Sequence, residues 1–373
     1  MGRPKIKIGV LTSSRADYGI YLPLLMELEK DTDIELSIIA FGTHLKKEFG
    51  STVQHIEKDG FTIDEKIDNL IHGDSAKDVA LNYAHTATLF SEIWAHSSYD
   101  CVLCLGDRFE MAAAVNAGIP FGITFAHLHA GETSEGAIDN IYRDQITLAS
   151  KLHFVSIKGF KKRIAHIIGY PDTAFYSGAM ALENLKSIQI LSVKEFRNKW
   201  GIDLSKPTIL VTVHPETIQP ERNQNHIKEL EKALRELLED TQVLATMPNA
   251  DTLGSLYRKM FDDMRELDNL KIVENLGTQS YFSAMKMSGL LLGNTSSGII
   301  EAASFGKYVI NLGERQKGRA HGENVIHKTF NSSEIYGAVK KYLNASYTGT
   351  NIYRSAEGIK HVIKTLKEKT YGA

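Results

Sequence analysis

Short runs of apolar and β-branched residues alternate along the chain with longer segments in which apolar positions recur every three or four residues. In the first half, the runs predict strands at Ile6–Thr12, Ile34–Phe41, Cys101–Leu105, Gly122–His127 and Leu152–Val155. Between them, the helical spacing predicts helices at Tyr21–Glu29, Ser75–His96, Glu110–Ala117 and Ile138–Leu148. Strands that are apolar throughout and alternate with helices are typical of a parallel sheet covered on both faces.

The same alternation starts again in the second half. It predicts strands at Thr208–Val213, Gln242–Thr246, Leu270–Val273, Gly289–Leu292 and Tyr308–Leu312. Helices are expected at Asn225–Glu239, Thr252–Arg265, Ser280–Lys286 and Ile299–Phe305. The turn-rich stretch from Gly169 to Gly178 lacks this order, so we place a domain boundary near Gly178. A chain of 373 residues suits two cores, and we expect two doubly wound α/β domains.

Composition and charge narrow the possible partners. The chain has 43 basic and 45 acidic residues, so no general positive field draws it to nucleic acid or to a membrane surface. No run of about 18 apolar residues predicts a transmembrane helix, and the N-terminus resembles no secretory signal. Cys101 and Cys104 lie in one buried strand and should face opposite ways, which favours two core residues over a zinc site. These features indicate a cytoplasmic protein.

Ligands of doubly wound sheets bind where the strands end and the next helices begin. If two such sheets face each other across a cleft, every motif that follows a strand points toward one site. The first strand ends in Thr12–Gly19, where Ser14 and Arg15 at a helix start suit a phosphate group. An N-cap at Ser13 or Ser14 beside a solvated arginine explains the same residues equally well.

Acidic residues follow two more strands of the first half. Asp107 and Arg108 follow Gly106 at the end of Cys101–Leu105, and their clustering with Glu110 favours a site-facing carboxylate over a simple helix cap. Glu132 follows the next strand, after His127 and His129, whose spacing is not that of a helical metal site. Asp139 and Arg143 are one helical turn apart, so they either form a surface ion pair or line the site together.

The second half carries two further motifs of this kind. His214 ends a buried strand and precedes a proline, which favours an extended backbone there. Gly293–Gly298 contains Asn294, Ser296 and Ser297, and its small residues allow a diphosphate to approach the backbone. Glu301, one turn into the next helix, is suited to accept both hydroxyls of a ribose. The basic segment Arg315–Arg319 either neutralises an anion or is a solvated loop.

Taken together, six segments resemble the hydrolysing UDP-N-acetylglucosamine 2-epimerases of sialic acid biosynthesis in order and spacing. They are Ser14–Gly19, Leu105–Arg108, His127–Glu132, His214–Thr217, Gly293–Gly298 and Asn311–Arg319 with Gly322–Val325. The resemblance covers nearly the whole chain. It implies the two-domain fold of the glycosyltransferase-B type, with a sugar-binding domain at 1–178, a UDP-binding domain at 179–354, and a segment at 355–373 whose helix returns to the first domain.

The resemblance also implies the chemistry. UDP leaves by anti elimination across C1 and C2 to give 2-acetamidoglucal, and water then adds to give free N-acetylmannosamine. By this match Asp107, Glu132 and Asp139 do acid and base work, and Arg143 orients an acidic partner. The diphosphate and its departure involve Arg15, His214, Ser296, Ser297 and Arg319, while Glu301 holds the ribose. The expected substrate-binding set is completed by Ser14, Arg108, His129, Asn294 and Arg315.

Some alternatives stay open at this stage. Related epimerases often carry glutamate where this chain has His129, so either Glu132 or Asp139 replaces that acid, or His129 itself moves the proton. A relative in legionaminic acid synthesis would act on UDP- or GDP-N,N′-diacetylbacillosamine instead. A glycosyltransferase of the same fold and a non-catalytic nucleotide-sugar sensor are weaker alternatives. The family implies no metal or redox cofactor, and a homodimer or homotetramer.

Overall fold

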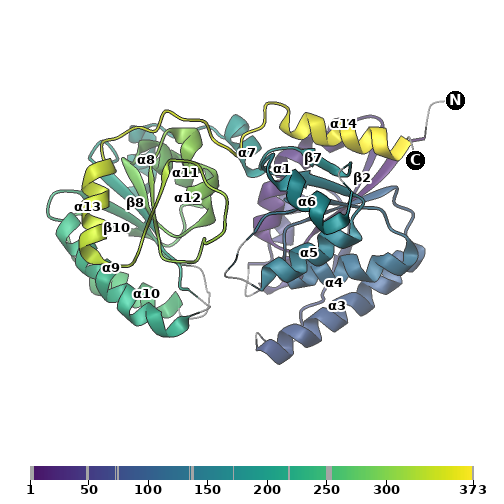
Figure 1. The fold of residues 1–373 in the computed structure, drawn as a ribbon, viewed down its shortest axis with the longest axis horizontal. Helices are drawn as coiled ribbons and strands as arrows, with labels where there is room; N and C mark the ends of the chain where they lie inside the picture. The colour runs from purple at the N-terminus through teal and green to yellow at the C-terminus, as the bar shows by residue number, and fades with distance from the viewer. Residues whose placement is uncertain are drawn as a thin grey trace. The chain divides into compact units, whose positions relative to one another are not determined.

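The computed structural model describes residues 4–47, 50–71, 73, 75–133, 135, 138–170, 172–216, 219–248 and 254–371. The chain divides into two compact units (Figure 1). The first unit comprises the described residues up to Thr133, Ile138–Lys186 and the chain from Tyr353 onward. The second is built mainly from Ser187–Ile352. The sequence predicted boundaries at 178 and 354, and the observed breaks between the units follow residues 186 and 352.

The first unit is a seven-stranded parallel sheet with the order β3-β2-β1-β4-β5-β6-β7. Its strands are β1 (Ile6–Thr12), β2 (Ile34–Phe41), β3 (Ile63–Ile67), β4 (Cys101–Leu105), β5 (Phe125–Leu128), β6 (Leu152–Val155) and β7 (Ala174–Tyr176). Its α-helices are α1 (Arg15–Lys30), α2 (Val53–Lys58), α3 (Ala76–His96), α4 (Phe109–Gly118), α5 (Asp139–Ala149), α6 (Phe160–Ile168), α7 (Ala181–Ser187) and α14 (Gly358–Tyr371). Short 3₁₀ helices occupy Gly42–Leu45 and Ile119–Phe121.

Apolar side chains cover both faces of this sheet. Cys101 belongs to the cluster that packs against α1 and α14, whereas Cys104 belongs to the cluster around Trp94 on the other face. The expectation that the two cysteines face opposite ways is therefore confirmed. Trp94 lies edge-on to Phe125, and its indole N–H donates to the Ala114 carbonyl oxygen at 2.8 Å. This contact fixes α3 against α4.

The second unit is a six-stranded parallel sheet with the order β10-β9-β8-β11-β12-β13. Its strands are β8 (Thr208–Thr212), β9 (Gln242–Thr246), β10 (Leu270–Val273), β11 (Leu290–Gly293), β12 (Val309–Leu312) and β13 (Val325–Lys328). Its α-helices are α8 (Val193–Trp200), α9 (Asn223–Leu237), α10 (Gly254–Asp263), α11 (Gly277–Met287), α12 (Ser296–Ile300) and α13 (Ser332–Tyr342). Short 3₁₀ helices occupy Pro220–Arg222 and Ala302–Phe305.

The expectation of two doubly wound α/β sheets is confirmed, and the differences lie at the sheet edges. The apolar pattern did not predict β3, β7 and β13. All three lie at a sheet edge, where strands are often short and carry polar residues because only one side is paired. The turn-rich stretch before Gly178 therefore contains a strand. The strand expected from Gly122 begins only at Phe125, because Gly122 ends a 3₁₀ helix in the left-handed conformation. The helix expected from Thr252 starts outside the described residues.

The C-terminal helix α14 is part of the first unit and packs beside α1 (Figure 1, yellow). Ile359, Val362 and Leu366 are buried in the same apolar cluster as β1. At the far end of the helix, Lys367 pairs with Asp31 and Asp33. None of the helices in the described part of the chain combines the length and apolar character needed to cross a membrane.

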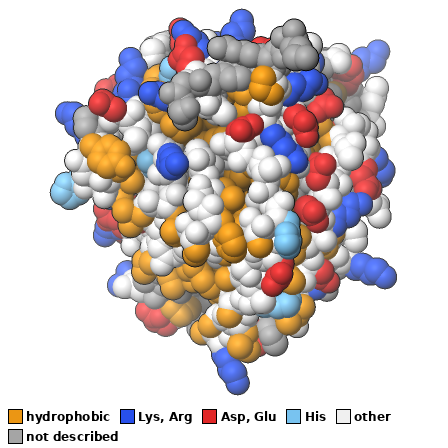
Figure 2. Space-filling view, turned by 90° about the vertical axis from the view of Figure 1, so that its right-hand side faces the viewer, with side chains coloured by type: hydrophobic (Ala, Val, Ile, Leu, Met, Phe, Trp, Pro, Cys, Tyr) orange, Lys and Arg blue, Asp and Glu red, His pale blue; other side chains and the backbone are white. Residues whose placement is uncertain are grey.

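Several large apolar side chains of the first unit remain exposed. Ile141 and Leu148 lie seven residues apart on α5 and therefore on one helix face, and each exposes about 60% of its surface. Ile119 and Leu148 also line a shallow hollow at the C-terminal ends of α4 and α5. In Figure 2 apolar side chains gather in a band among polar ones on the face shown. The oligomeric state stays a prediction.

The docking of α14 can be tested by shortening its buried face. Leu366→Ala should lower the free energy of unfolding of the first unit by about 2–5 kcal/mol, because Leu366 is fully buried. Lys364→Ala on the exposed side of the same helix is the matched control and should change it by less than about 0.5 kcal/mol. Urea unfolding in a Trp200→Phe background, followed by selective excitation of Trp94 as the single remaining tryptophan, measures this unit. Equal effects of the two variants would contradict the docking.

Candidate active site

Both sheets change winding direction in their interior. In the first unit β1 and β4 are neighbours, and the chain continues to β2 on one side and to β5 on the other. In the second unit β8 and β11 are neighbours in the same way. Loops diverge at such a switch point and leave a crevice at the carboxyl ends of the strands. The sequence motifs follow β1, β4 and β5 in the first unit and β8, β11 and β12 in the second, so each unit collects its motifs at this position.

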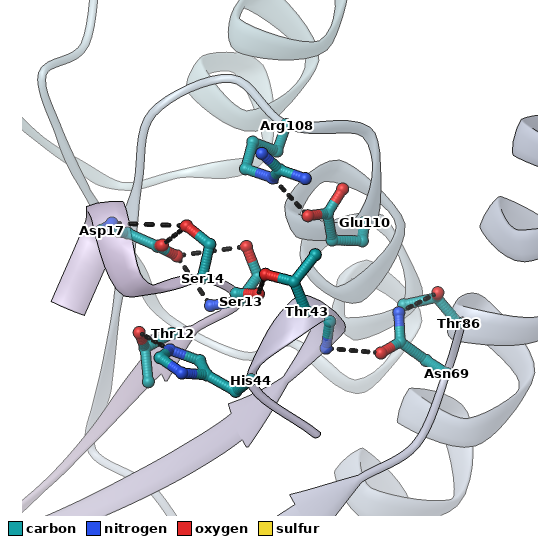
Figure 3. A network of polar contacts seen from close by, with 11 residues as sticks. Thr12, Ser13, Ser14, Asp17, Thr43, His44, Asn69, Thr86, Arg108 and Glu110 are labelled. Atoms are coloured by element: carbon teal, nitrogen blue, oxygen red, sulfur yellow. Dashed lines mark hydrogen bonds and ion pairs between the residues drawn. The ribbon is translucent and has the colours of Figure 1, made fainter. Parts of the chain in front are cut away.

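The β1–α1 loop is organised by Asp17 (Figure 3). The Asp17 carboxylate accepts the Ser13 N–H at 2.6 Å and the Ser13 hydroxyl at 3.1 Å, and the Ser14 hydroxyl donates to its other oxygen. Ser14 is the N-cap of α1 and accepts the Asp17 N–H at 3.4 Å. Burial raises the pKa of Asp17, and these hydrogen bonds oppose the rise. The capping explanation for Ser14 is thus confirmed, while the Arg15 side chain is exposed beside it.

Arg108 lies among three carboxylates. Its guanidinium pairs with Glu110, which is fully buried although it carries a carboxylate (Figure 3). The charges of Glu110, Asp17 and Asp107 together raise the pKa of Arg108, with Glu110 contributing most. Close to half of the Arg108 side chain remains exposed. The loops after β1 and β4 therefore present one fixed cation at the edge of the sheet.

Arg143 brings three parts of the first unit together. It forms an ion pair with Asp107, donates to the Glu132 carbonyl oxygen at 3.0 Å and to the Asn140 side-chain oxygen at 3.1 Å. Only 3% of its surface is exposed, so it is not part of a surface ion pair. Spacing along α5 left open a pair between Arg143 and Asp139, and the ion pair that forms is with Asp107 instead.

Asp139 is half-buried at the first residue of α5. Burial raises the pKa of Asp139, and the nearby charge of Asp107 raises it further, while Arg143 and Arg108 act in the opposite direction. The two carboxyl groups are thus in different environments. Arg143 forms its ion pair with Asp107 and not with Asp139. Such separation is how a protein keeps one carboxyl ionised and another ready to donate a proton.

Glu132 is held by buried donors. One carboxylate oxygen accepts His129 Nδ1 at 2.9 Å and the Ser156 hydroxyl at 2.6 Å. The Met180 N–H donates to His129 Nε2 at 3.3 Å, so this nitrogen carries no proton and Nδ1 is the donor to Glu132. Both ring nitrogens of His129 are therefore engaged within the protein. Its backbone is left-handed at φ 63°, which is uncommon outside glycine and turns the ring toward Glu132.

His127 is a structural histidine. Its ring contacts the Gly106 carbonyl oxygen at 2.9 Å and the Thr147 hydroxyl at 3.1 Å. Burial lowers the pKa of His127 to about 3, so the ring stays neutral and joins the loop after β4 to α5. Across the described ranges, no group of three or more His, Cys, Asp and Glu side chains is arranged to hold a metal ion.

The second unit links the ends of β8 and β11 through one asparagine. Asn294 accepts the His214 N–H at 2.8 Å and donates to the His214 carbonyl oxygen at 2.8 Å. Gly293, at φ 147°, lies against the Thr212 carbonyl, where any side chain would overlap the backbone. Thr295 then caps α12 by accepting the Ser297 N–H at 3.3 Å. This brings His214, Ser296 and Ser297 to the same edge of the sheet.

The loop after β12 closes over the same edge. Arg315 and Gln316 both donate to the Asn294 carbonyl oxygen, at 3.1 Å and 3.0 Å. Burial raises the pKa of Glu301 to about 7, although Ser297 and the charge of Arg319 lower it. One Glu301 oxygen has no hydrogen-bond partner within the described chain. A buried carboxylate with a spare acceptor is suited to a ligand that brings hydroxyl donors.

Four polar residues of these sites were not among the predicted site residues. Asp17 lies inside the segment Ser14–Gly19 and Glu110 lies two residues after Leu105–Arg108, but neither was given a role. Ser156 directly follows β6, where a strand-end rule could have found it. Tyr281 on α11 is half-buried, and the pKa of its hydroxyl is raised to about 12 by burial of that group and by the Glu301 charge. No local pattern marks Tyr281, because its proximity to Glu301 depends on helix packing.

The raised pKa of Glu301 predicts a pH effect on stability. The folded chain holds this proton up to about pH 7, whereas an unfolded glutamate loses it near 4.5. Stability should therefore fall as pH rises through this window, by about 2 kcal/mol between pH 5 and 8. Glu301→Gln should remove this fall, so that the variant gains on the wild type at pH 8. Urea unfolding of both proteins without nucleotide tests this, and parallel pH profiles would contradict it.

Comparison with known proteins gives the family. A family model described as UDP-N-acetylglucosamine 2-epimerase matches residues 26–367. The GDP/UDP-N,N′-diacetylbacillosamine 2-epimerase (hydrolyzing) of Campylobacter jejuni is 34% identical over 329 residues, which cover 88% of this chain and 85% of that relative. The UDP-N,N′-diacetylbacillosamine 2-epimerase (hydrolyzing) of Legionella pneumophila is 33% identical over 342 residues, which cover 91% of this chain and 89% of that relative.

A solved structure supports the fold independently. The crystal structure of UDP-GlcNAc 2-epimerase from Neisseria meningitidis bound to UDP-GlcNAc matches with a TM-score of 0.80 and 18% identity, covering 97% of this chain and 100% of that chain. At this identity the likeness concerns the fold, which is of the glycosyltransferase-B type. With one switch point in each of two doubly wound sheets, and a family model that matches almost the whole sequence, this chain belongs to the UDP-N-acetylglucosamine 2-epimerase family.

Proposed function

We propose that this chain is a hydrolysing 2-epimerase of UDP-N,N′-diacetylbacillosamine, releasing UDP and the free 2-epimer of the sugar. The names and identities of the Campylobacter and Legionella relatives support this substrate. They favour it over UDP-N-acetylglucosamine and sialic acid synthesis, which the sequence motifs alone suggested first. The motifs could not separate the two, because the sugars differ at C4 and C6 while the reaction takes place at C1 and C2.

The chemistry requires a base, a leaving group and a proton donor. The base removes the C2 proton as the bond from C1 to the UDP oxygen breaks, which leaves a C1=C2 double bond in the sugar. Water then adds its hydroxyl to C1, and a proton returns to C2 on the other face. The C2 proton is weakly acidic, so a positioned carboxylate and a stabilised leaving group must lower the barrier together.

The carboxyl pair of the first unit is the observation that carries the proposal. In it, Asp107 is the base, and its carboxylate is oriented by the ion pair with Arg143. Asp139 is the acid, since burial and the Asp107 charge raise its pKa. Glu132 orients the site through His129 and Ser156 instead of exchanging a proton with the sugar, because its carboxylate already accepts two buried donors.

In this proposal the second unit binds the nucleotide. The diphosphate contacts Ser296, Ser297 and His214, and the cations Arg315 and Arg319 stabilise the charge that develops as UDP departs. The spare oxygen of Glu301 accepts the ribose hydroxyls, for which its burial without a partner is the supporting observation. Arg108 contacts the sugar from the β4 loop. Epimerisation proceeds through these protein groups without a redox cofactor.

UDP-N-acetylglucosamine is the second candidate substrate, with N-acetylmannosamine as product. The description of the matching family model supports it. The same elimination and hydration would apply, because neither step involves C4 or C6.

Direct turnover decides between the two substrates. Purified protein is incubated separately with UDP-N,N′-diacetylbacillosamine and UDP-N-acetylglucosamine, and UDP and the free sugar are quantified. We expect at least a tenfold higher kcat/KM for the diacetamido sugar, the size of effect that one buried substituent contact produces. In heavy water, deuterium should appear at C2 of the product. UDP release without deuterium at C2 would indicate simple hydrolysis, and a preference for UDP-N-acetylglucosamine would overturn the substrate assignment.

The acid and base assignment makes its own prediction. Asp107→Asn and Asp139→Asn should each lower kcat by about 10²–10⁴-fold, because each removes one proton-transfer group. Asp144→Asn is the matched control on α5, where Asp144 pairs with Arg163, and it should keep nearly full turnover. Circular dichroism verifies the folding of all three variants. Normal turnover in both Asp107→Asn and Asp139→Asn would show that the assignment is wrong.

A further inference from the structure

Glu216 is a buried carboxylate to which the proposed function gives no role. It follows β8 by a few residues and exposes only 6% of its surface. Asn223 holds its backbone from both directions, accepting the Glu216 N–H at 3.0 Å and donating to its carbonyl oxygen at 2.8 Å. The Tyr257 hydroxyl in turn donates to the Asn223 side chain at 3.1 Å. These hydrogen bonds therefore fix the backbone position of Glu216.

The carboxylate of Glu216 contacts the loop that follows β12. One oxygen accepts the Glu314 N–H at 2.6 Å. The preceding residue, Gly313, has a left-handed backbone at φ 68°, and a side chain there would overlap the Glu216 carboxylate. Only glycine permits both the conformation and this close approach. Because β11 lies between β8 and β12 in the sheet, Glu216 reaches past one strand to join the loops of the other two.

This contact continues into the groups proposed to bind the diphosphate. Directly after Glu314, Arg315 and Gln316 donate to the Asn294 carbonyl oxygen, and Asn294 holds the His214 backbone. The loops after β8, β11 and β12 thus form one closed hydrogen-bonded network. The segment Gly313–Arg319 carries three cations, Arg315, Lys317 and Arg319, of which Lys317 pairs with Glu314 at 3.1 Å. The hydrogen bonds of Glu314, Arg315 and Gln316 hold the start of this segment.

We propose that Glu216 is a positioning residue that fixes the segment Gly313–Arg319, so that Arg315 and Arg319 are held ready for the nucleotide diphosphate. The proposal rests on the proposed function, because it assigns UDP to this edge of the second unit. Glu216 itself does not touch the ligand. Its contribution is the hydrogen bond to Glu314, which requires a side chain of this length with an acceptor oxygen.

The test measures UDP binding in four full-length variants by titration calorimetry. Glu216→Ala and Glu216→Asp should weaken UDP binding by at least tenfold, because neither places an acceptor oxygen at the Glu314 N–H. Glu216→Gln keeps the reach and the acceptor and should stay within about threefold of wild type, since one neutral hydrogen bond is retained. Glu221→Ala, on the exposed connection nearby, is the control and should leave binding unchanged.

Turnover adds a readout that simple misfolding does not reproduce. In Glu216→Ala and Glu216→Asp we expect KM to rise while kcat falls less than threefold, since the proton-transfer groups lie in the other unit. Wild-type UDP affinity in both variants would overturn the proposal, as would equal loss in Glu216→Gln and Glu216→Ala.

A second measurement does not depend on UDP. Hydrogen exchange of the peptide covering Gly313–Arg319 should be faster in Glu216→Ala than in wild type and close to wild type in Glu216→Gln. Unchanged exchange in Glu216→Ala would overturn the positioning role, whatever UDP does. Failure of the wild-type protein to bind UDP, with exchange responding as expected, would instead count against the nucleotide assignment of the second unit.

Discussion

The pairing of buried carboxylates with nearby donors is the constraint on which the first unit depends. A carboxylate removed from water costs several kcal/mol unless cations or hydrogen-bond donors replace its hydration. Asp107 meets Arg143, Glu110 meets Arg108, and Glu132 meets His129 and Ser156. The pair of Asp107 and Arg143 joins the loop after β4 to α5, and the Ser156 hydroxyl joins the loop after β6 to Glu132 in the loop after β5, so these segments must come together for the unit to fold. The contacts that would position these carboxylates for catalysis thus also offset the free-energy cost of burying them.

The second unit joins its loops mainly through uncharged groups. Asn294 links the loops after β8, β11 and β12 through side-chain and backbone hydrogen bonds, in which the Arg315 guanidinium is the charged donor. Glu301 differs, because it is buried with a raised pKa and an oxygen that meets no donor in the described chain. A hydroxyl-bearing ligand would supply donors at this oxygen and favour the ionised form. Ligand binding and the protonation of Glu301 are therefore expected to be linked.

The residue at position 129 affects which role its neighbour Glu132 can have. Related epimerases often have glutamate at this position, which made it uncertain which residue moves the proton. Here both nitrogens of the ring are engaged, and the ring orients Glu132. In the proposed mechanism the acid is therefore Asp139, whose pKa is raised by burial and by the Asp107 charge. The substrate assignment changed as well, because the relatives at 33–34% identity act on a different sugar from the one that the motifs suggested.

The sequence by itself determined the two parallel sheets, because strands buried on both faces must be apolar along their whole length. Ile6–Thr12, Ile34–Phe41 and Cys101–Leu105 accordingly have the predicted bounds. It also placed the functional motifs at strand ends, where parallel strands bring loops to one edge. Only the tertiary structure decided which partner each charged residue has. Asp139 lies four residues from Arg143, yet Asp107, 36 residues away, forms the ion pair. The Glu216 carboxylate accepts the Glu314 N–H although the two residues are 98 positions apart. The order of strands in the sheet brings their loops together, and local residue spacing does not predict that order.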